Sequence, residues 1–161
     1  MLVAFVESIK YVGHLLPVAC LRIFVGYYYF NQALMSLQSD FLSRAYFAED
    51  IRNFIPQSTA PDWYKGALET IVIPNWQVFA VSVTAIYLLI GFSYILGYLV
   101  RPISLLAVFL SVNLVFSLGS QHSEVLSPMV MALHLMLGWM GAGRCLGIDY
   151  YFYKRRRGIW W

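Results

Sequence analysis

The sequence predicts an all-α membrane protein: an antiparallel bundle of four transmembrane helices with an amphipathic helix on the outer side. Composition and charge spacing both support this fold class. Hydrophobic residues make up 60% of the chain and charged residues only 12%, which is about half the charged fraction of soluble domains. The few charges are also spaced so that long stretches contain none, and a bilayer core needs about 20 mostly apolar helical residues to cross it.

Four stretches of the chain contain no Asp, Glu, Lys or Arg: residues 23–39, 70–100, 102–123 and 125–143. With their apolar flanks, these stretches predict transmembrane helices at 15–37, 76–100, 103–119 and 126–148. A buried helix of a soluble protein is the alternative for any one segment, but four in succession favour a membrane protein. The first segment is expected to be retained, because it is long and lacks the small-x-small cleavage pattern of a signal peptide.

The first predicted helix carries Arg22 within an otherwise apolar and aromatic run. Ala19, Gly26 and Ala33 fall on the same helical face as this arginine. Small residues on one face let neighbouring helices approach closely. We therefore expect Arg22 to point into the bundle, where a charge persists only if it is paired or solvated.

The segment at 38–75 connects the first two predicted transmembrane helices on the outer side. From Phe41 to Ile55, apolar residues recur at near-helical spacing among charged ones. This pattern predicts an amphipathic helix that lies at the membrane surface or caps the bundle. A second short helix is expected between Asp62 and Ile71. Connections of this length are often functional.

Basic residues are distributed unevenly between the two sides of the predicted bundle. One side holds Lys10, Arg101 and the four basic residues at 154–157, whereas the other holds fewer. The positive-inside rule then places both termini in the cytoplasm of a prokaryotic inner membrane, with several membrane crossings between them. We divide the chain into a four-helix membrane domain at 1–150 and a basic, aromatic cytoplasmic tail at 151–161, which can attract anionic lipid at about 1 kcal/mol per charge.

A cluster of charges is predicted at the cytoplasmic ends of the helices. Most acidic residues lie on the outer side, so only Glu7 and Asp149 can pair with Arg22. We predict that Arg22 and Asp149 gather there with Arg101 and Arg144. Two interpretations are left open: a polar staple that fixes helix packing, or a binding site for an anion or a lipid headgroup, because three arginines outnumber one aspartate.

Polar residues also lie near the predicted middle of the membrane. His134 is placed there, with Tyr87 and Asn113 also at membrane depth, so these three side chains are candidates for binding a quinone carbonyl. An interhelical hydrogen bond is the alternative for His134. Haem ligation by two histidines is disfavoured, because His14 and His122 fall at other depths. The sequence shows no zinc-ligand spacing, nucleotide-binding loop or nucleophile elbow, and nothing suggests nucleic acid, so quinone is the one cofactor considered.

Three motifs stand out along the helical segments: LRIFVG at 21–26, GFSYILGYLVRP at 91–102 and GAGRCLGID at 141–149. Together they resemble the DoxX/DoxD-type family of small membrane proteins. The resemblance implies a four-helix membrane bundle, and the name-giving type is a subunit of a thiosulfate:quinone oxidoreductase. Where the family commonly has Gly-x-x-Lys near the end of the first helix, this chain has ALMS at 33–36. This departure weakens any inference of substrate-anion binding at that point.

Two functions are consistent with these observations. In the first, the chain is an integral membrane subunit of a larger membrane oxidoreductase or respiratory-type complex, docks quinone and is not catalytic alone. In the second, it is a purely structural or assembly subunit of a multi-protein membrane complex. Cofactors usually carry the difficult chemistry of redox enzymes, and a chain this small without a cofactor motif is expected to work with partner subunits. The sequence leaves open whether the chain is itself an enzyme.

Overall fold

The computed structural model describes residues 13–42, 44–58, 60–118 and 126–155, and every regular element within these ranges is helical. The all-helical part of the predicted fold class is therefore confirmed. The four long helices are α2 (Leu16–Gln38), α5 (Trp76–Leu96), α6 (Val100–Leu118) and α7 (Leu126–Trp139). Several residues used in the sequence analysis lie outside the described ranges: Glu7, Lys10, His122 and the tail at 156–161.

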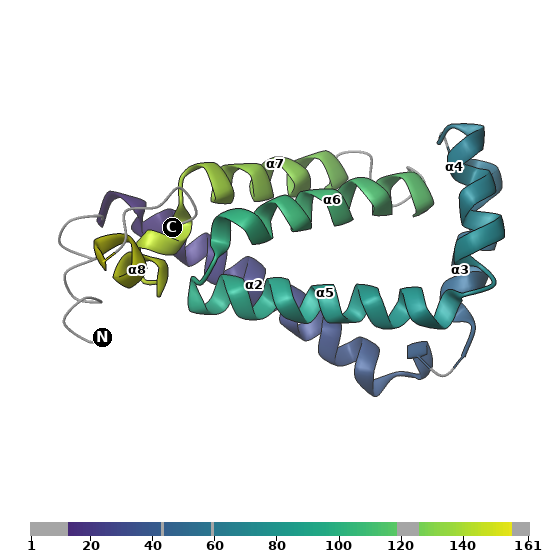
Figure 1. Cartoon of the computed structure of the whole chain (residues 1–161), viewed down its shortest axis with the longest axis horizontal. Coiled ribbons are helices and arrows are strands. Elements are labelled where there is room, and N and C mark those ends of the chain that lie inside the picture. The colour runs from purple at the N-terminus through teal and green to yellow at the C-terminus, as the bar shows by residue number, and fades with distance from the viewer. Residues whose placement is uncertain (1–12, 43, 59, 119–125, 156–161) are drawn as a thin grey trace.

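The four long helices run alongside one another, as Figure 1 shows. Helix α2 packs mainly against α5, and α6 packs mainly against α7. Short helices lie across one end of the bundle, which we call the α4 end: η2 (Asp40–Leu42), α3 (Tyr46–Phe54), η3 (Ile55–Gln57), α4 (Asp62–Ala67) and the π-turn η4 (Leu68–Val72). The opposite end, called the α8 end, holds η1 (Gly13–Leu15), η6 (Ala142–Arg144) and α8 (Asp149–Arg155).

The segment at 38–75 forms two short helices, as the sequence analysis predicted, with turns between them. Helix α3 presents Ile51 to the bundle, and this residue packs with Ile55 and Leu68 in a small apolar cluster. The larger core receives buried residues from all four long helices. A second apolar layer therefore closes the α4 end.

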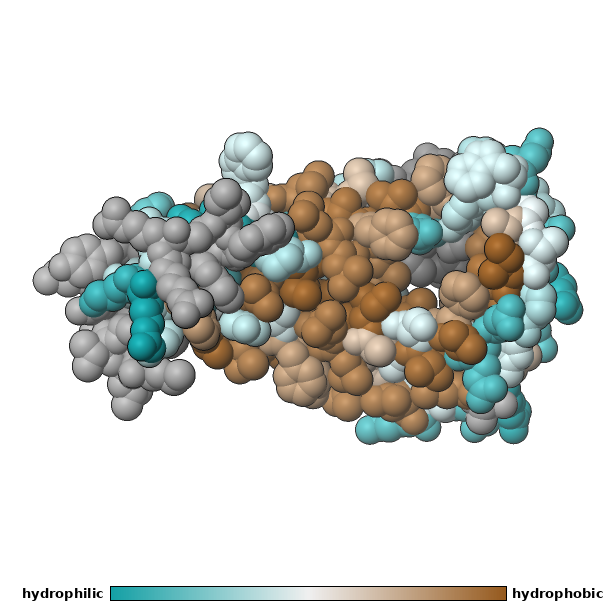
Figure 2. All heavy atoms as spheres, in the orientation of Figure 1, coloured by the Kyte–Doolittle hydropathy of each residue, from teal (hydrophilic) through white to brown (hydrophobic). Residues whose placement is uncertain are grey.

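The outside of the long helices is also hydrophobic. Figure 2 shows a broad band of hydrophobic side chains over the middle of the molecule and hydrophilic side chains gathered at the α4 end. Each long helix contributes exposed apolar side chains to the surface, for example Phe24, Val78, Phe109 and Met129. Soluble monomers rarely expose apolar patches larger than a few hundred Å², so this band indicates an apolar environment.

Within the described residues, α5 is the helix that is long and apolar enough to span a membrane by length and composition. The apolar stretches Val100–Asn113 in α6 and Pro128–Trp139 in α7 are shorter than a full crossing. The four predicted crossings therefore stay a prediction.

The boundaries of two predicted helices were wrong. The fourth helix was expected to reach residue 148 but ends at Trp139, and the second was expected to reach residue 100 but ends at Leu96. In each case a glycine adopts a left-handed conformation just beyond the helix, with φ of +62° at Gly141 and +65° at Gly97. Glycine adopts this conformation without steric cost and commonly ends helices.

Gly143 lies in η6 and Gly147 lies in the irregular turn that follows it. A close helix contact occurs between α2 and α5. A Cβ atom added to Gly26 would lie 2.8 Å from the Cβ of Tyr94, and one added to Gly91 would lie 2.8 Å from the backbone nitrogen of Phe30. The two helices therefore touch through their backbones at both glycines.

Substitution of Gly91 by alanine is expected to destabilise the protein by about 1–3 kcal/mol, as overpacking of a tight core typically does. The new methyl group would meet the backbone of α2, which cannot move aside without separating the helices. The measurement is the thermal unfolding midpoint in mild detergent. Gly66→Ala is the matched control, because a Cβ at this position in α4 meets nothing within 4 Å. Equal midpoints for the two variants would contradict this prediction.

Candidate functional site

Arg22 is fully buried at the α8 end of the bundle. Its Nη1 donates hydrogen bonds to the carbonyl oxygens of Ala142 at 2.7 Å and Cys145 at 3.3 Å. Its Nη2 donates to the carbonyl oxygen of Leu146 at 3.0 Å. Guanidinium presents several donors in a fixed plane, so a single side chain can hold three carbonyls of a non-helical turn.

Asp149, which follows this turn in the chain, bonds to the turn between α5 and α6. Its carboxylate accepts hydrogen bonds from the backbone N–H groups of Leu99 at 2.8 Å and Val100 at 3.2 Å, at the start of α6. Its own backbone N–H donates to the carbonyl of Gly97 at 2.9 Å. Burial raises the pKa of this carboxyl, and the two accepted hydrogen bonds and the nearby arginines oppose that rise. These hydrogen bonds therefore connect the α5–α6 turn to the segment after α7.

The four residues of the predicted charge cluster fall into two groups. Arg22 and Asp149 both lie beside the α5–α6 turn, and their hydrogen bonds go to backbone groups. Arg101 and Arg144 both lie beside Gly141, where an added Cβ would lie 3.3 Å from one guanidinium and 3.5 Å from the other. The Arg144 guanidinium also lies 4.3 Å from the centre of the Tyr153 ring in α8. The first group has the contacts of a packing staple.

His134 is fully buried on α7 between two tyrosines from other helices. Its Nε2 is 2.8 Å from the hydroxyl of Tyr29 on α2, and its Nδ1 is 3.0 Å from the hydroxyl of Tyr94 on α5. A neutral imidazole has one nitrogen that donates and one that accepts, so one tyrosine donates to His134 and the other accepts from it. Both ring nitrogens are therefore occupied by protein groups. No group of three His, Cys, Asp or Glu side chains in the described residues could hold a metal ion.

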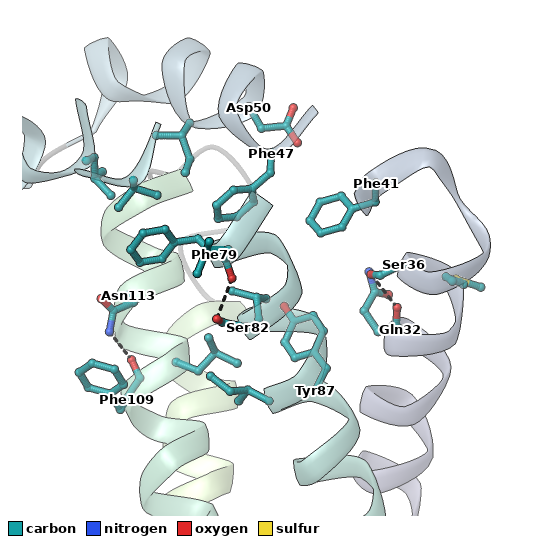
Figure 3. A pocket seen from close by; sticks show the side chains of 18 of the residues that line it. Gln32, Ser36, Phe41, Phe47, Asp50, Phe79, Ser82, Tyr87, Phe109 and Asn113 are labelled. Atoms are coloured by element: carbon teal, nitrogen blue, oxygen red, sulfur yellow. Dashed lines mark hydrogen bonds between the residues drawn. The ribbon is translucent and has the colours of Figure 1, made fainter. Parts of the chain in front are cut away.

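A cavity of about 650 Å³ lies at the α4 end, and we call it the α4-end cavity. Its walls come from α2, α5 and α6, and η2 and α3 cover it, as Figure 3 shows. Most lining residues are apolar. The polar ones are Gln32, Ser36, Ser39, Asp50, Tyr64, Ser82, Tyr87 and Asn113.

Asn113 is held in place at the wall of the α4-end cavity. Its Nδ2 donates to the carbonyl of Phe109 at 2.8 Å, and its Oδ1 accepts from the hydroxyl of Tyr64 on α4 at 3.2 Å. Burial raises the pKa of Tyr64, so its hydroxyl keeps the proton that it donates. This contact ties α4 to α6 and fixes the direction of the Asn113 amide.

The three residues predicted to bind quinone are divided between two places. Tyr87 and Asn113 line the α4-end cavity, whereas His134 lies deeper and is not among the lining residues. Tyr29 connects the two places, because its hydroxyl contacts His134 and its ring makes an edge contact with Tyr87, 5.4 Å between centres.

The sequence analysis did not assign roles to the tyrosines Tyr29, Tyr64 and Tyr94. A signal for Tyr29 was present, since it lies seven residues after Arg22 and therefore on the same buried face of α2. Tyr94 similarly lies three residues after Gly91, on the face of α5 that contacts α2. Tyr64 carried no comparable signal, because its partner on α6 depends on how α4 crosses the bundle.

Comparison with known proteins identifies the family. The family model described as TQO small subunit DoxD matches residues 17–159. This match includes the four long helices from residue 17 onward. It also includes the contacts of Arg22 and Asp149 at the α8 end and the walls of the α4-end cavity. No curated protein and no solved structure matches the chain. DoxD proteins are small subunits of membrane oxidoreductase complexes of the thiosulfate:quinone oxidoreductase type. The chain therefore belongs to the DoxD family.

Proposed function

We propose that this chain is the quinone-docking small subunit of a membrane oxidoreductase, and that the quinone ring binds in the α4-end cavity. The observation that carries the proposal is the cavity itself. It is largely apolar, has a volume within the usual range for small-molecule sites, and has a few polar groups fixed in its walls.

The polar groups suit the two carbonyls of a quinone. The Tyr87 hydroxyl and the Asn113 amide supply N–H and O–H donors from α5 and α6. Asn113 is oriented by Tyr64, so its direction is set before ligand binds. Exposed apolar side chains such as Met35 and Val78 also line the cavity, so a hydrophobic quinone tail can leave it towards lipid.

We also propose that α2, α5, α6 and α7 cross a prokaryotic inner membrane with the α8 end in the cytoplasm. The hydrophobic band over these helices supports this arrangement (Figure 2). The basic residues Arg101, Arg144, Lys154 and Arg155 lie at the α8 end, in agreement with the positive-inside rule. The short helices α3 and α4 then lie on the outer side.

The outer face is the proposed contact for the catalytic partner. Trp63 on α4 is 75% exposed and Tyr46 on α3 is 43% exposed. Exposed aromatic side chains of this kind are enriched at protein interfaces. A partner bound here would lie directly over the α4-end cavity and could deliver electrons to the quinone ring.

The test is the quinone content of the complex purified from its native membrane in mild detergent. We expect about one quinone per particle in the wild-type complex. Asn113→Ala is expected to weaken quinone binding about tenfold, the effect of losing a hydrogen bond of about 1.4 kcal/mol. Asn53→Ala is the matched control, since Asn53 is exposed on α3 and does not line the cavity.

A wild-type complex that contains no quinone would contradict this proposal. Such a result, with partner subunits still bound, would support the alternative of a structural or assembly subunit. Equal quinone content in Asn113→Ala and Asn53→Ala would instead place the quinone elsewhere in the complex.

A further inference from the structure

A second cavity has His134 in its wall. It has a volume of about 420 Å³, lies between the α8-proximal halves of α6 and α7, and is called the α6–α7 cavity. Arg101, Ser104 and His134 are among its lining residues. His134 thus forms part of the wall of this cavity, while its ring contacts Tyr29, the neighbour of Tyr87 in the α4-end cavity.

The polar residues between the two cavities are arranged in order along the bundle. Ser104 lies in the second turn of α6, near the α8 end, and Tyr94 lies in the last turn of α5 at the same end. His134 lies near the middle of α7, and Tyr29 lies near the middle of α2. Tyr87 follows, about two turns of α5 further towards the α4 end than Tyr94.

We propose that Tyr94, His134 and Tyr29 form a proton relay from the α6–α7 cavity to quinone bound in the α4-end cavity. This inference rests on the proposed function, because it requires quinone in that cavity. Its basis is the hydrogen bonding of three buried side chains, at 3.0 Å and 2.8 Å. His134 lines the α6–α7 cavity, and the Tyr29 ring contacts the ring of Tyr87 in the wall of the α4-end cavity.

The geometry permits transfer without a buried charge remaining. The Tyr94 hydroxyl gives its proton to Nδ1 of His134, Nε2 gives its proton to the Tyr29 oxygen, and Tyr29 releases its original proton towards Tyr87 and the quinone. Tyr94 then takes a proton from the side of Ser104 and the α6–α7 cavity. One O–H or N–H bond breaks for each one that forms. The transfer leaves His134 in its other neutral tautomer, which has to exchange its proton before the next transfer.

Quinone reduction requires such a supply of protons. Each of the two carbonyl oxygens gains one O–H bond, so the reaction consumes two electrons and two protons. The electron donor in the proposed complex is a reduced sulfur anion such as thiosulfate, oxidised by the catalytic partner. Joining two thiosulfate anions through a new S–S bond releases two electrons and no proton. Both protons must therefore come from water, and the relay draws them from the α8 side.

The test uses the purified native complex in lipid vesicles with the α8 end facing the lumen. Thiosulfate is added outside, decylubiquinone is present in the membrane, and the pH indicator pyranine is enclosed in the lumen. We expect the lumen to become alkaline during turnover of the wild-type complex. Tyr94→Phe removes the first relay proton and is expected to slow quinone reduction about a hundredfold, with unchanged quinone content.

Tyr28→Phe is the matched control, because Tyr28 is 60% exposed on α2 next to Tyr29. It should leave turnover, lumen pH change and quinone content unchanged. Wild-type turnover without alkalinisation of the lumen would overturn the relay, and this measurement needs no variant. Full turnover and full alkalinisation in Tyr94→Phe would overturn it as well. Both results leave the quinone site intact, whereas a wild-type complex without quinone overturns the site and the relay together.

Discussion

Substitution of Arg22 by leucine is expected to prevent the folded protein from accumulating in the membrane. Arg22 satisfies three backbone carbonyls of the turn after α7, and leucine offers no donor. A buried acceptor left without a partner costs about 1–3 kcal/mol, so three of them cost several kcal/mol. That is a large part of the roughly 5–15 kcal/mol by which native proteins are stable.

The measurement is the yield of folded protein by size-exclusion chromatography in mild detergent. Arg22→Lys should give an intermediate yield, because an ammonium group cannot reach the same carbonyls in the plane of a guanidinium. Arg44→Leu is the matched control. Arg44 lies on the surface, 65% exposed in its side chain, in an ion pair with Asp40, and exposed ion pairs contribute about 0–1 kcal/mol. Equal yields for Arg22→Leu and Arg44→Leu would contradict the prediction.

The position of Arg22 was readable from the sequence, but its partners were not. Helical spacing places Arg22 on the small-residue face of its helix, and the structure places it in the interior. The sequence predicted an acidic partner, Asp149, by elimination, together with a fourth helix that continues to residue 148. Since α7 ends at Trp139, the carbonyls of Ala142, Cys145 and Leu146 accept hydrogen bonds from Arg22.

The sequence did not predict the end of α7 for a related reason. Charge spacing identifies apolar segments, and the charge-free stretch continues past Trp139 to residue 143. Whether Gly141 ends the helix or lies within it depends on contacts with α6 and the α5–α6 turn, because glycine is tolerated in both conformations. The motif at 91–102 forms the α5–α6 turn, and the glycine-rich motif at 141–149 is bonded to this turn through Asp149.

Two of the three residues predicted to bind quinone, Tyr87 and Asn113, line the α4-end cavity. Polar residues at membrane depth identified Tyr87, Asn113 and His134, since such residues are rare there and usually functional. Their division between a cavity and a buried hydrogen-bond chain depends on the rotation of α7 relative to α2 and α5. The α4-end cavity itself depends on the path of α3 and α4 across the bundle. Hydrophobic periodicity predicts that such helices exist and does not predict where they cross.

Filling the α4-end cavity is expected to abolish quinone-dependent activity while the protein stays folded. Ser82 on α5 lines this cavity, as Figure 3 shows. Its hydroxyl bonds only the preceding turn of its own helix, to Val78 at 2.7 Å. Ser82→Trp would place an indole in the space proposed for the quinone ring. We expect quinone to be absent from the purified variant complex and its quinone reductase rate to fall about a hundredfold or more, the loss expected when a reacting group cannot be positioned.

Val81→Trp is the matched control for this substitution. Val81 adjoins Ser82 on the same helix, is 49% exposed and does not line the cavity. The two variants carry the same bulky side chain in the same helix, so they differ mainly in whether the cavity is filled. Thermal unfolding of both complexes would show whether the fold is retained. Quinone content and turnover equal to wild type in a folded Ser82→Trp complex would show that the cavity is not the site of quinone binding. Loss in Ser82→Trp alone would show that quinone binds in this cavity, beneath the helices proposed to bind the catalytic partner.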